Sequence, residues 1–231
     1  MMFFDMEYLI IMAPVFIFSL GAQWMVKSRY KKFSQYGLSS GQTGAEIARQ
    51  ILRGNRINDV AVEETGGWLS DHYSPTEKVL RLSSDVYNGR SISSAGIAAH
   101  EAGHALQHAS GYAIMNMWQM LAKPATFASN FAVWALLIGF FLNMFGLIQL
   151  GILLFAFIVL FQLVTLPVEF NASSRAKQLL SQYNIIRGAE YAAVGSVLNA
   201  AAMTYVAAAA VSIAQLLYFL MRAGFLGGRD D

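Results

Sequence analysis

Residues 124–168 read PATFASNFAVWALLIGFFLNMFGLIQLGILLFAFIVLFQLVTLPV and contain no Asp, Glu, Lys or Arg. A membrane-spanning helix needs about 20 predominantly apolar residues, so this stretch is long enough for two spans. Asn143 and Gly146 lie near its middle and are residue types that favour turns. The stretch therefore predicts a helical hairpin with spans at 124–144 and 147–167.

Two further uncharged stretches predict one span each. They cover residues 8–26 and 191–221, and we place the spans at 8–26 and 199–221. Charged residues make up only 13% of the 231-residue chain, against about 25% in a soluble domain. Buried helices of a soluble protein are the alternative, but stretches of this length have no amphipathic face to present to water. We therefore expect a mainly α-helical, multi-pass membrane protein with four transmembrane helices.

Basic residues indicate the orientation. Of the 16 Lys and Arg residues, 11 lie in residues 27–123, and only Arg222 and Arg229 follow the last span. Cytoplasmic loops are enriched in Lys and Arg, so we expect residues 27–123 and 168–198 in the cytoplasm and both termini outside the cell membrane. The first span is expected to be an uncleaved anchor, because MMFFDMEY has two acids and no basic residue, unlike the start of a signal peptide.

Residues 27–123 are expected to fold as a small α+β domain. The run SSGQTGAEIARQIL, residues 39–52, predicts a helix that is capped by Ser40 or Thr43 and buries one face. Short apolar alternations in INDVAVEETGG and in residues 68–82 predict strands and turns. From Ile92 to His108 the pattern is helical again.

The last of these segments carries the motif HEAGH, residues 100–104. Residues four apart on a helix lie on the same face, so the rings of His100 and His104 can occupy two corners of a tetrahedral zinc site. Glu101 lies about 100° around the helix, where it can reach a zinc-bound water without joining the pair as a ligand. This pattern predicts a metallopeptidase in which zinc acidifies the water and Glu101 accepts its proton. The alternatives are a polar stripe on a surface helix, and a structural zinc site or storage of another metal.

A third ligand must be His, Asp or Glu, because the chain has no cysteine. His108 is one candidate, but a straight helix places it about 12 Å along the axis from His100. Glu169 is the stronger candidate, since it is the first charge after the long uncharged stretch and is expected at the same membrane face as the motif. The formal net charge of only +2 gives no indication of a nucleic-acid partner.

Four segments resemble one known family. GIAAHEAGHALQH (96–108), DHYSPTEKVLRLS (71–83), VYNGRSISSAG (86–96) and LPVEFNASSRA (166–176) are similar to the YugP-type membrane zinc metallopeptidases. More distantly, they resemble the HtpX and CAAX prenyl endopeptidases. The resemblance covers nearly the whole chain. It implies a zincin-like domain of the gluzincin type, with Glu169 as the third zinc ligand.

The resemblance also bears on the surroundings of the metal. HtpX-like proteins have an Asp four residues after that Glu, where this chain has Ser173, so Asn171 or Arg175 is left to replace it. An edge strand, either residues 79–82 or residues 71–73, is implied to hold the substrate backbone.

The function expected from these patterns is a Zn²⁺-dependent endopeptidase that cleaves polypeptides, principally membrane or membrane-proximal proteins. The alternative is a non-catalytic zinc-binding scaffold or chaperone, which a Gln in place of Glu101 would have favoured. A metal transporter is disfavoured, because the spans of a transporter would carry charged or His residues, and the four spans predicted here carry none. The group that stabilises the oxyanion stays open among His72, His108, Tyr191 and Arg175. Besides the lipid bilayer, the expected partners are a second copy of the chain or a regulatory membrane protein.

Overall fold

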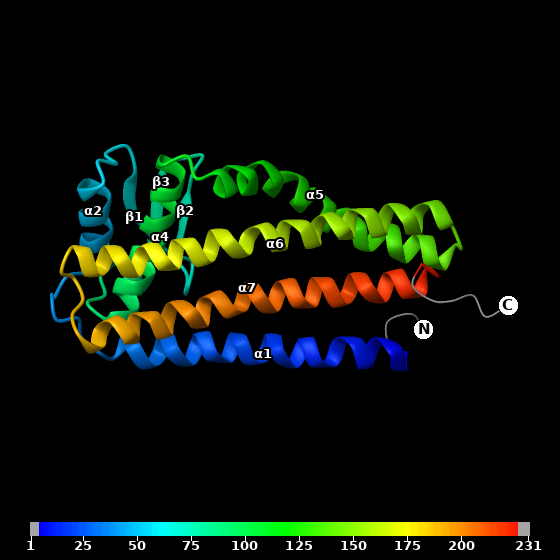
Figure 1. Cartoon of the computed structure of the whole chain (residues 1–231), viewed down its shortest axis with the longest axis horizontal. Coiled ribbons are helices and arrows are strands. Elements are labelled where there is room, and N and C mark those ends of the chain that lie inside the picture. The colour runs from blue at the N-terminus through cyan, green and yellow to red at the C-terminus, as the bar shows by residue number, and fades with distance from the viewer. Residues whose placement is uncertain (1–4, 226–231) are drawn as a thin grey trace. The chain divides into compact units, whose positions relative to one another are not determined.

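The computed structural model describes residues 5–225 and is mainly helical (Figure 1). Its elements are α1 (Met6–Ser34), α2 (Gly44–Gly54), β1 (Ala61–Thr65), β2 (His72–Ser74), β3 (Val79–Ser83), α3 (Ser84–Tyr87), α4 (Ile92–Ala109), α5 (Ala113–Phe141), α6 (Phe145–Gln182) and α7 (Ala189–Arg222). The chain divides into two compact units. The helical unit comprises the residues up to Ala22, Met117–Pro167 and the residues from Thr204 onward. The site unit comprises Gln23–Asn116 and Val168–Met203.

The helical unit contains the most apolar parts of the long helices. α1, α5, α6 and α7 are all long and apolar enough to cross a membrane, which agrees with the four spans predicted. Large apolar side chains such as Ile17, Trp134 and Leu153 have exposed fractions of 70%, 64% and 67%. Lipid tails are as apolar as these side chains, so exposure to a bilayer costs little. Leu136 and Tyr218 are fully buried and anchor the interior of this unit.

α5 and α6 form the predicted hairpin. The chain reverses at residues 142–144, where Asn143 has a φ of 53°, a left-handed conformation in which Asn is enriched. Gly139 allows the two helices to approach, because a Cβ there would lie 2.8 Å from the backbone nitrogen of Ile148. Gly146 belongs to the first turn of α6 and not to the reversal itself.

The helices extend beyond the predicted spans. α5 begins at Ala113, inside the segment 27–123 that was expected to precede the span, and α7 begins at Ala189 instead of near residue 199. α6 runs unbroken to Gln182, so the helix does not end at Pro167, where the predicted span 147–167 ends. Proline removes one backbone hydrogen bond, but the helical turns on both sides of Pro167 persist, as they do in other membrane helices. The segment 147–167 and the first part of the segment 168–198, up to Gln182, therefore share one helix.

In the site unit, α2, the sheet and α4 lie together (Figure 1). Thr43, and not Ser40, caps α2: its hydroxyl accepts the Glu46 N–H, and the Glu46 carboxylate accepts the Thr43 N–H. The predicted apolar face of α2 is buried. The sheet has the order β1–β3–β2, with β1 parallel and β2 antiparallel to β3. β3 is central, and its Leu80 and Leu82 are fully buried in the core of the unit.

α4 is the most enclosed helix of this unit. Ser91 caps its N-terminus, with a hydroxyl that accepts the Ser94 N–H. Its alanines at positions 95, 98, 99, 102 and 105 are at most 1% exposed. Small side chains let neighbouring elements pack closely against the helix. The HEAGH motif therefore lies within the core, which counts against the interpretation as a polar surface stripe.

Candidate metal centre

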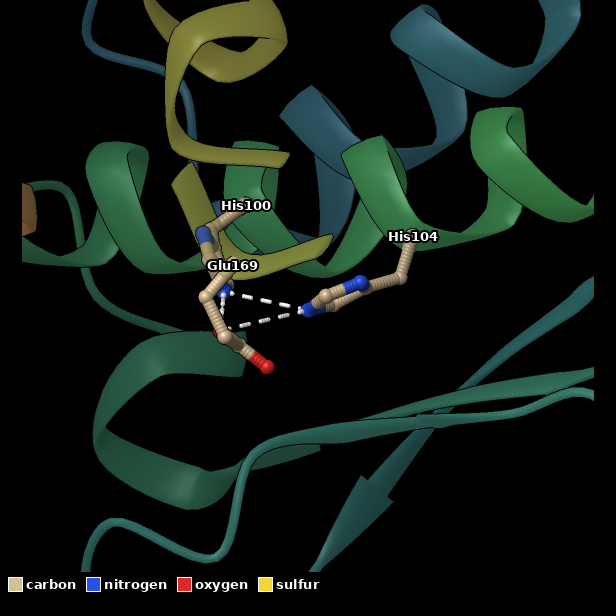
Figure 2. Close-up of side chains that lie close together, drawn as sticks. All are labelled: His100, His104 and Glu169. Atoms are coloured by element: carbon tan, nitrogen blue, oxygen red, sulfur yellow. Dashed lines mark hydrogen bonds and ion pairs between the residues drawn. The ribbon is translucent and has the colours of Figure 1, made fainter. Parts of the chain in front are cut away.

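Three side chains from two helices meet in the site unit. His100 and His104 extend from α4, and Glu169 extends toward them from α6 (Figure 2). The Nε2 atoms of the two histidines are 3.2 Å apart. Glu169 Oε2 lies 3.2 Å from His100 Nε2 and 3.7 Å from His104 Nε2. One atom from each residue thus lies within 4.8 Å of the other two, a grouping that can hold a metal ion.

The local sequence explains this convergence. His100 and His104 are one helical turn apart and face the same way, as the spacing predicts. Gly103 lies between them in the sequence and against the backbone of α6, where a Cβ would come within 2.9 Å of the carbonyl oxygen of Ala172. Ala172 is itself fully buried. The absence of a side chain at position 103 therefore brings α6, and Glu169 with it, close to the two histidines.

The spacing of these atoms fits a zinc ion. Ligand atoms about 2.0–2.1 Å from zinc at tetrahedral angles are roughly 3.3 Å apart, and the three observed separations are 3.2, 3.2 and 3.7 Å. Glu169 Oε2 is buried and, within residues 5–225, has no hydrogen bond of good geometry; its charged contacts are with the imidazoles of His100 and His104. Such an oxygen is costly unless a cation or donor satisfies it. Two imidazoles and one carboxylate are a donor set of catalytic zinc sites, which leave the fourth position open.

A glutamine orients the second histidine. Gln107 is fully buried, and its Nε2 donates to the carbonyl of Val168 at 2.8 Å and to Asn171 Oδ1 at 3.0 Å. Its Oε1 is therefore the acceptor that faces His104 Nδ1 at 3.0 Å. This bond places the ring proton on Nδ1 and leaves the Nε2 lone pair for a metal.

Ser173 has the corresponding position beside the first histidine. Its hydroxyl lies 3.2 Å from His100 Nδ1, so the residue found where HtpX-like proteins have Asp contacts the imidazole directly. Asn171 accepts a hydrogen bond from Arg175 Nε at 2.8 Å and, as above, one from Gln107. The guanidinium of Arg175 also lies over the ring of Tyr112, 5.8 Å from its centroid. Asn171 thus contacts Gln107, which contacts His104, and Arg175 contacts Asn171.

Glu101 lies within the core beside this group and is 8% exposed. Burial raises the pKa of its carboxyl; the charges of His100 and His104 oppose this, and the nearby carboxylates of Glu169 and Asp71 add to it. A carboxylate with a raised pKa is a stronger base near neutral pH than an exposed one. Glu101 is therefore suited to proton transfer.

The carboxylates around His104 raise the pKa of its imidazole. Burial lowers this pKa, but the Glu169 carboxylate and the charge of Glu101 outweigh burial and raise it to about 9. This direction favours the protonated imidazole at neutral pH, with its charge balanced by the carboxylates. A metal ion must displace that proton, because an imidazole binds metals only in its neutral form.

Comparison with known proteins places the chain in a family. The family model described as "Putative neutral zinc metallopeptidase" matches residues 8–224. The chain belongs to this zinc metallopeptidase family. Over 213 residues it is 52% identical to the "Putative membrane protease YugP" of Bacillus subtilis (strain 168), an alignment that covers 92% of this chain and 94% of that protein. No solved structure matches the chain. Membership in a zinc metallopeptidase family agrees with the donor set found here.

The other candidate residues lie apart from the three ligand atoms. His108 Nδ1 is 2.8 Å from the hydroxyl of Tyr73 on β2, and His108 is not part of the metal-binding group of the described residues. His72 is exposed, and its Nδ1 lies 2.8 Å from the carbonyl of Ser70. Tyr191 is 46% exposed on the first turn of α7.

The strand order shows which of the two candidate segments is an edge strand. β3 is paired on both sides, so the prediction that residues 79–82 form an edge strand is wrong. β2 is an edge of the sheet and pairs His72 with Arg81 and Tyr73 with Leu80.

The sequence did not indicate that Gln107 contacts His104, and it left the role of Ser173 beside His100 in doubt. A glutamine three residues after His104 on the same helix was the available signal, since such residues are neighbours.

Proposed function

We propose that this protein is a zinc-dependent membrane endopeptidase that hydrolyses peptide bonds in membrane or membrane-proximal proteins. The observation that carries the proposal is the group of His100, His104 and Glu169, with separations close to those of a tetrahedral zinc site. Glu101, the residue after the first ligand, supplies a buried carboxylate beside it. Family membership supports the same reaction class.

Each side chain has a role that follows from its contacts. His100, His104 and Glu169 would hold zinc, while Gln107 and Ser173 fix the two imidazole rings. Zinc in such a site acidifies a water molecule and polarises a carbonyl oxygen. Glu101 accepts the proton of the attacking water and then delivers it to the leaving amine. In this scheme the domain is zincin-like, with the HEAGH motif on α4 and the third ligand on a later helix.

The edge strand β2 is the proposed binding strand for the substrate. A peptide that lies extended along a free sheet edge gains backbone hydrogen bonds without regard to its side chains. β2 also lies next to α4, since Tyr73 reaches His108. This arrangement would bring a peptide carbonyl toward the metal.

The active site is proposed to face the cytoplasm, with both termini outside. The excess of Lys and Arg in residues 27–123 supports this orientation. A reporter fused after Lys32 should then read as cytoplasmic and one at the C-terminus as external. The reverse pattern would place the active site on the outer face.

The decisive experiment replaces Glu101 with Gln. Membrane proteins from cells that produce the wild type, Glu101→Gln or the control Glu64→Gln, an exposed carboxylate on β1, are compared by quantitative mass spectrometry. Fragments should appear with the wild type and the control and disappear with Glu101→Gln, with a loss of at least about 100-fold on any substrate found. Zinc content should stay unchanged. Identical fragment patterns for all three proteins would reject the peptidase and favour the scaffold.

A further inference from the structure

A hollow of about 590 Å³ lies in the site unit, lined by the parts of α1, α6 and α7 that belong to this unit. These helix segments are far apart in the sequence but lie side by side (Figure 1). The hollow has no part in the metal centre, since none of the three metal-binding residues lines it.

Two cations line the hollow without an acidic residue to balance them. They are Arg29 of α1 and Lys177 of α6, both partly buried, and the lining contains no Asp or Glu. Within the described part of the chain neither forms an ion pair with a carboxylate. The stem of Lys177 crosses toward α7, where a Cβ added at Gly195 would lie 3.7 Å from Lys177 Cδ. Two positive charges that line the same concave site attract an anion.

The rest of the lining changes from polar to apolar along the helices. On α1, Met25 belongs to the uncharged stretch that ends at Val26, whereas Arg29 lies beyond it. On α7, Tyr191 lies in the first turn, whereas Met203 lies 12 residues further along, about 18 Å along the axis and within the predicted span 199–221. The apolar end therefore lies toward the predicted membrane spans on both helices. Tyrosine is a residue type enriched at the level of lipid headgroups.

We propose that this hollow binds one anionic phospholipid of the cytoplasmic leaflet. The phosphate lies between Arg29 and Lys177, and an acyl chain follows the apolar lining from Met25 to Met203. Asn199, which has a polar side chain in the same hollow, provides a hydrogen-bonding group for the headgroup. A free phosphate would use only the two cations and leave the apolar half without a partner, so the lining favours a lipid over an inorganic anion.

The test measures lipid binding to the full-length protein in detergent by native mass spectrometry. Dioleoylphosphatidylglycerol, which is anionic, and dioleoylphosphatidylcholine, which is zwitterionic, are titrated separately, and inorganic phosphate is added as a competitor. The wild type should bind one phosphatidylglycerol at least about tenfold more tightly than phosphatidylcholine. A cation near an anionic lipid strengthens binding by about fivefold, so Arg29→Gln/Lys177→Gln should weaken phosphatidylglycerol binding by about 25-fold.

The control is Lys27→Gln/Lys31→Gln, which removes the same charge from exposed positions of α1 outside the hollow. It should keep the preference for phosphatidylglycerol, and both variants should keep wild-type helicity and zinc content. Equal losses in the two double variants would show a diffuse attraction and overturn the proposal. Displacement of phosphatidylglycerol by equimolar phosphate, or an absence of lipid preference in the wild type, would overturn it as well.

Discussion

Gly103→Ala tests whether the close approach of α4 and α6 assembles the metal centre. A Cβ at this position would lie 2.9 Å from the carbonyl oxygen and 3.4 Å from the Cα of Ala172, both backbone atoms. The Ala172 backbone lies between Glu169 and Ser173, which contact the two histidines. Alanine is favoured over glycine in a helix by about 1 kcal/mol, so helix propensity alone would make the variant more stable.

The size of the effect follows from the overlap. Ordinary contact requires roughly 3.4 Å between these atoms, so the two helices must separate by roughly 0.5 Å, whereas metal ligands hold their distances within about 0.2 Å. Overpacking of this kind costs about 1–3 kcal/mol. In the metal-free protein α6 can move away and relieve the overlap, but in the zinc-bound form the bond from Glu169 to the metal would hold α6 in place. Zinc affinity should therefore fall by about 5- to 150-fold.

Gly96→Ala is the matched control for this variant. Gly96 lies on the same helix two turns earlier, and a Cβ there would meet Val194 Cγ1 at 3.5 Å, an ordinary contact. Zinc affinity of both variants and the wild type is measured by competition with a chromophoric chelator, with helicity as the check on folding. Wild-type affinity in Gly103→Ala, or equal losses in both variants, would refute the idea that this contact positions Glu169.

Three further predictions concern the metal ligands and their partners. Glu169→Ala should lower the zinc content from about one per chain to a small fraction, because only two protein ligands remain, whereas His108→Ala should keep the wild-type zinc content. Elemental analysis of both variants measures this, and the opposite pattern would make His108 the third ligand. Gln107→Leu should weaken zinc binding by about 10- to 100-fold, since it removes the acceptor that orients His104. Gln178→Leu, at an exposed position, serves as the control, and equal zinc affinities of the two variants would show that Gln107 does not have this role. Zinc must displace the proton of His104, whose pKa is raised to about 9, so apparent zinc affinity should rise by up to about tenfold per pH unit above pH 7 and less steeply near pH 9. Calorimetry in two buffers of different ionisation enthalpy counts the protons released, and a pH-independent affinity would contradict the protonated state.

The sequence predicts the main features of the fold because they depend on residues close together in the chain. Absence of charge over residues 124–168 is enough to indicate two long helices, and Asn143 marks the turn between them. Helix ends are harder to predict, since α5 begins at Ala113 in a segment of mixed polarity. The helix that continues through Pro167 is also hard to predict, because a proline can begin a helix or lie within one, and only the surrounding structure decides.

The site is less accessible from sequence because it joins distant segments. The four-residue spacing of His100 and His104 is a local signal, and it placed the rings together. Glu169 became the stronger ligand candidate only through the membrane topology and the resemblance to a family. Gln107 gave no comparable signal, because its importance depends on the Val168 carbonyl and on Asn171, 61 and 64 residues away. The pairing of β3 on both sides likewise depends on long-range contacts.

The order in which the chain is synthesised has a consequence for when activity can begin. His100, Glu101 and His104 leave the ribosome first, and Glu169 follows only after residues 113–167, which include α5 and the apolar half of α6. At about 5–20 residues per second, this interval lasts several seconds. During that time the nascent chain has two of the three proposed ligands. Under the proposed function, the enzyme would therefore stay inactive until its hairpin had been made.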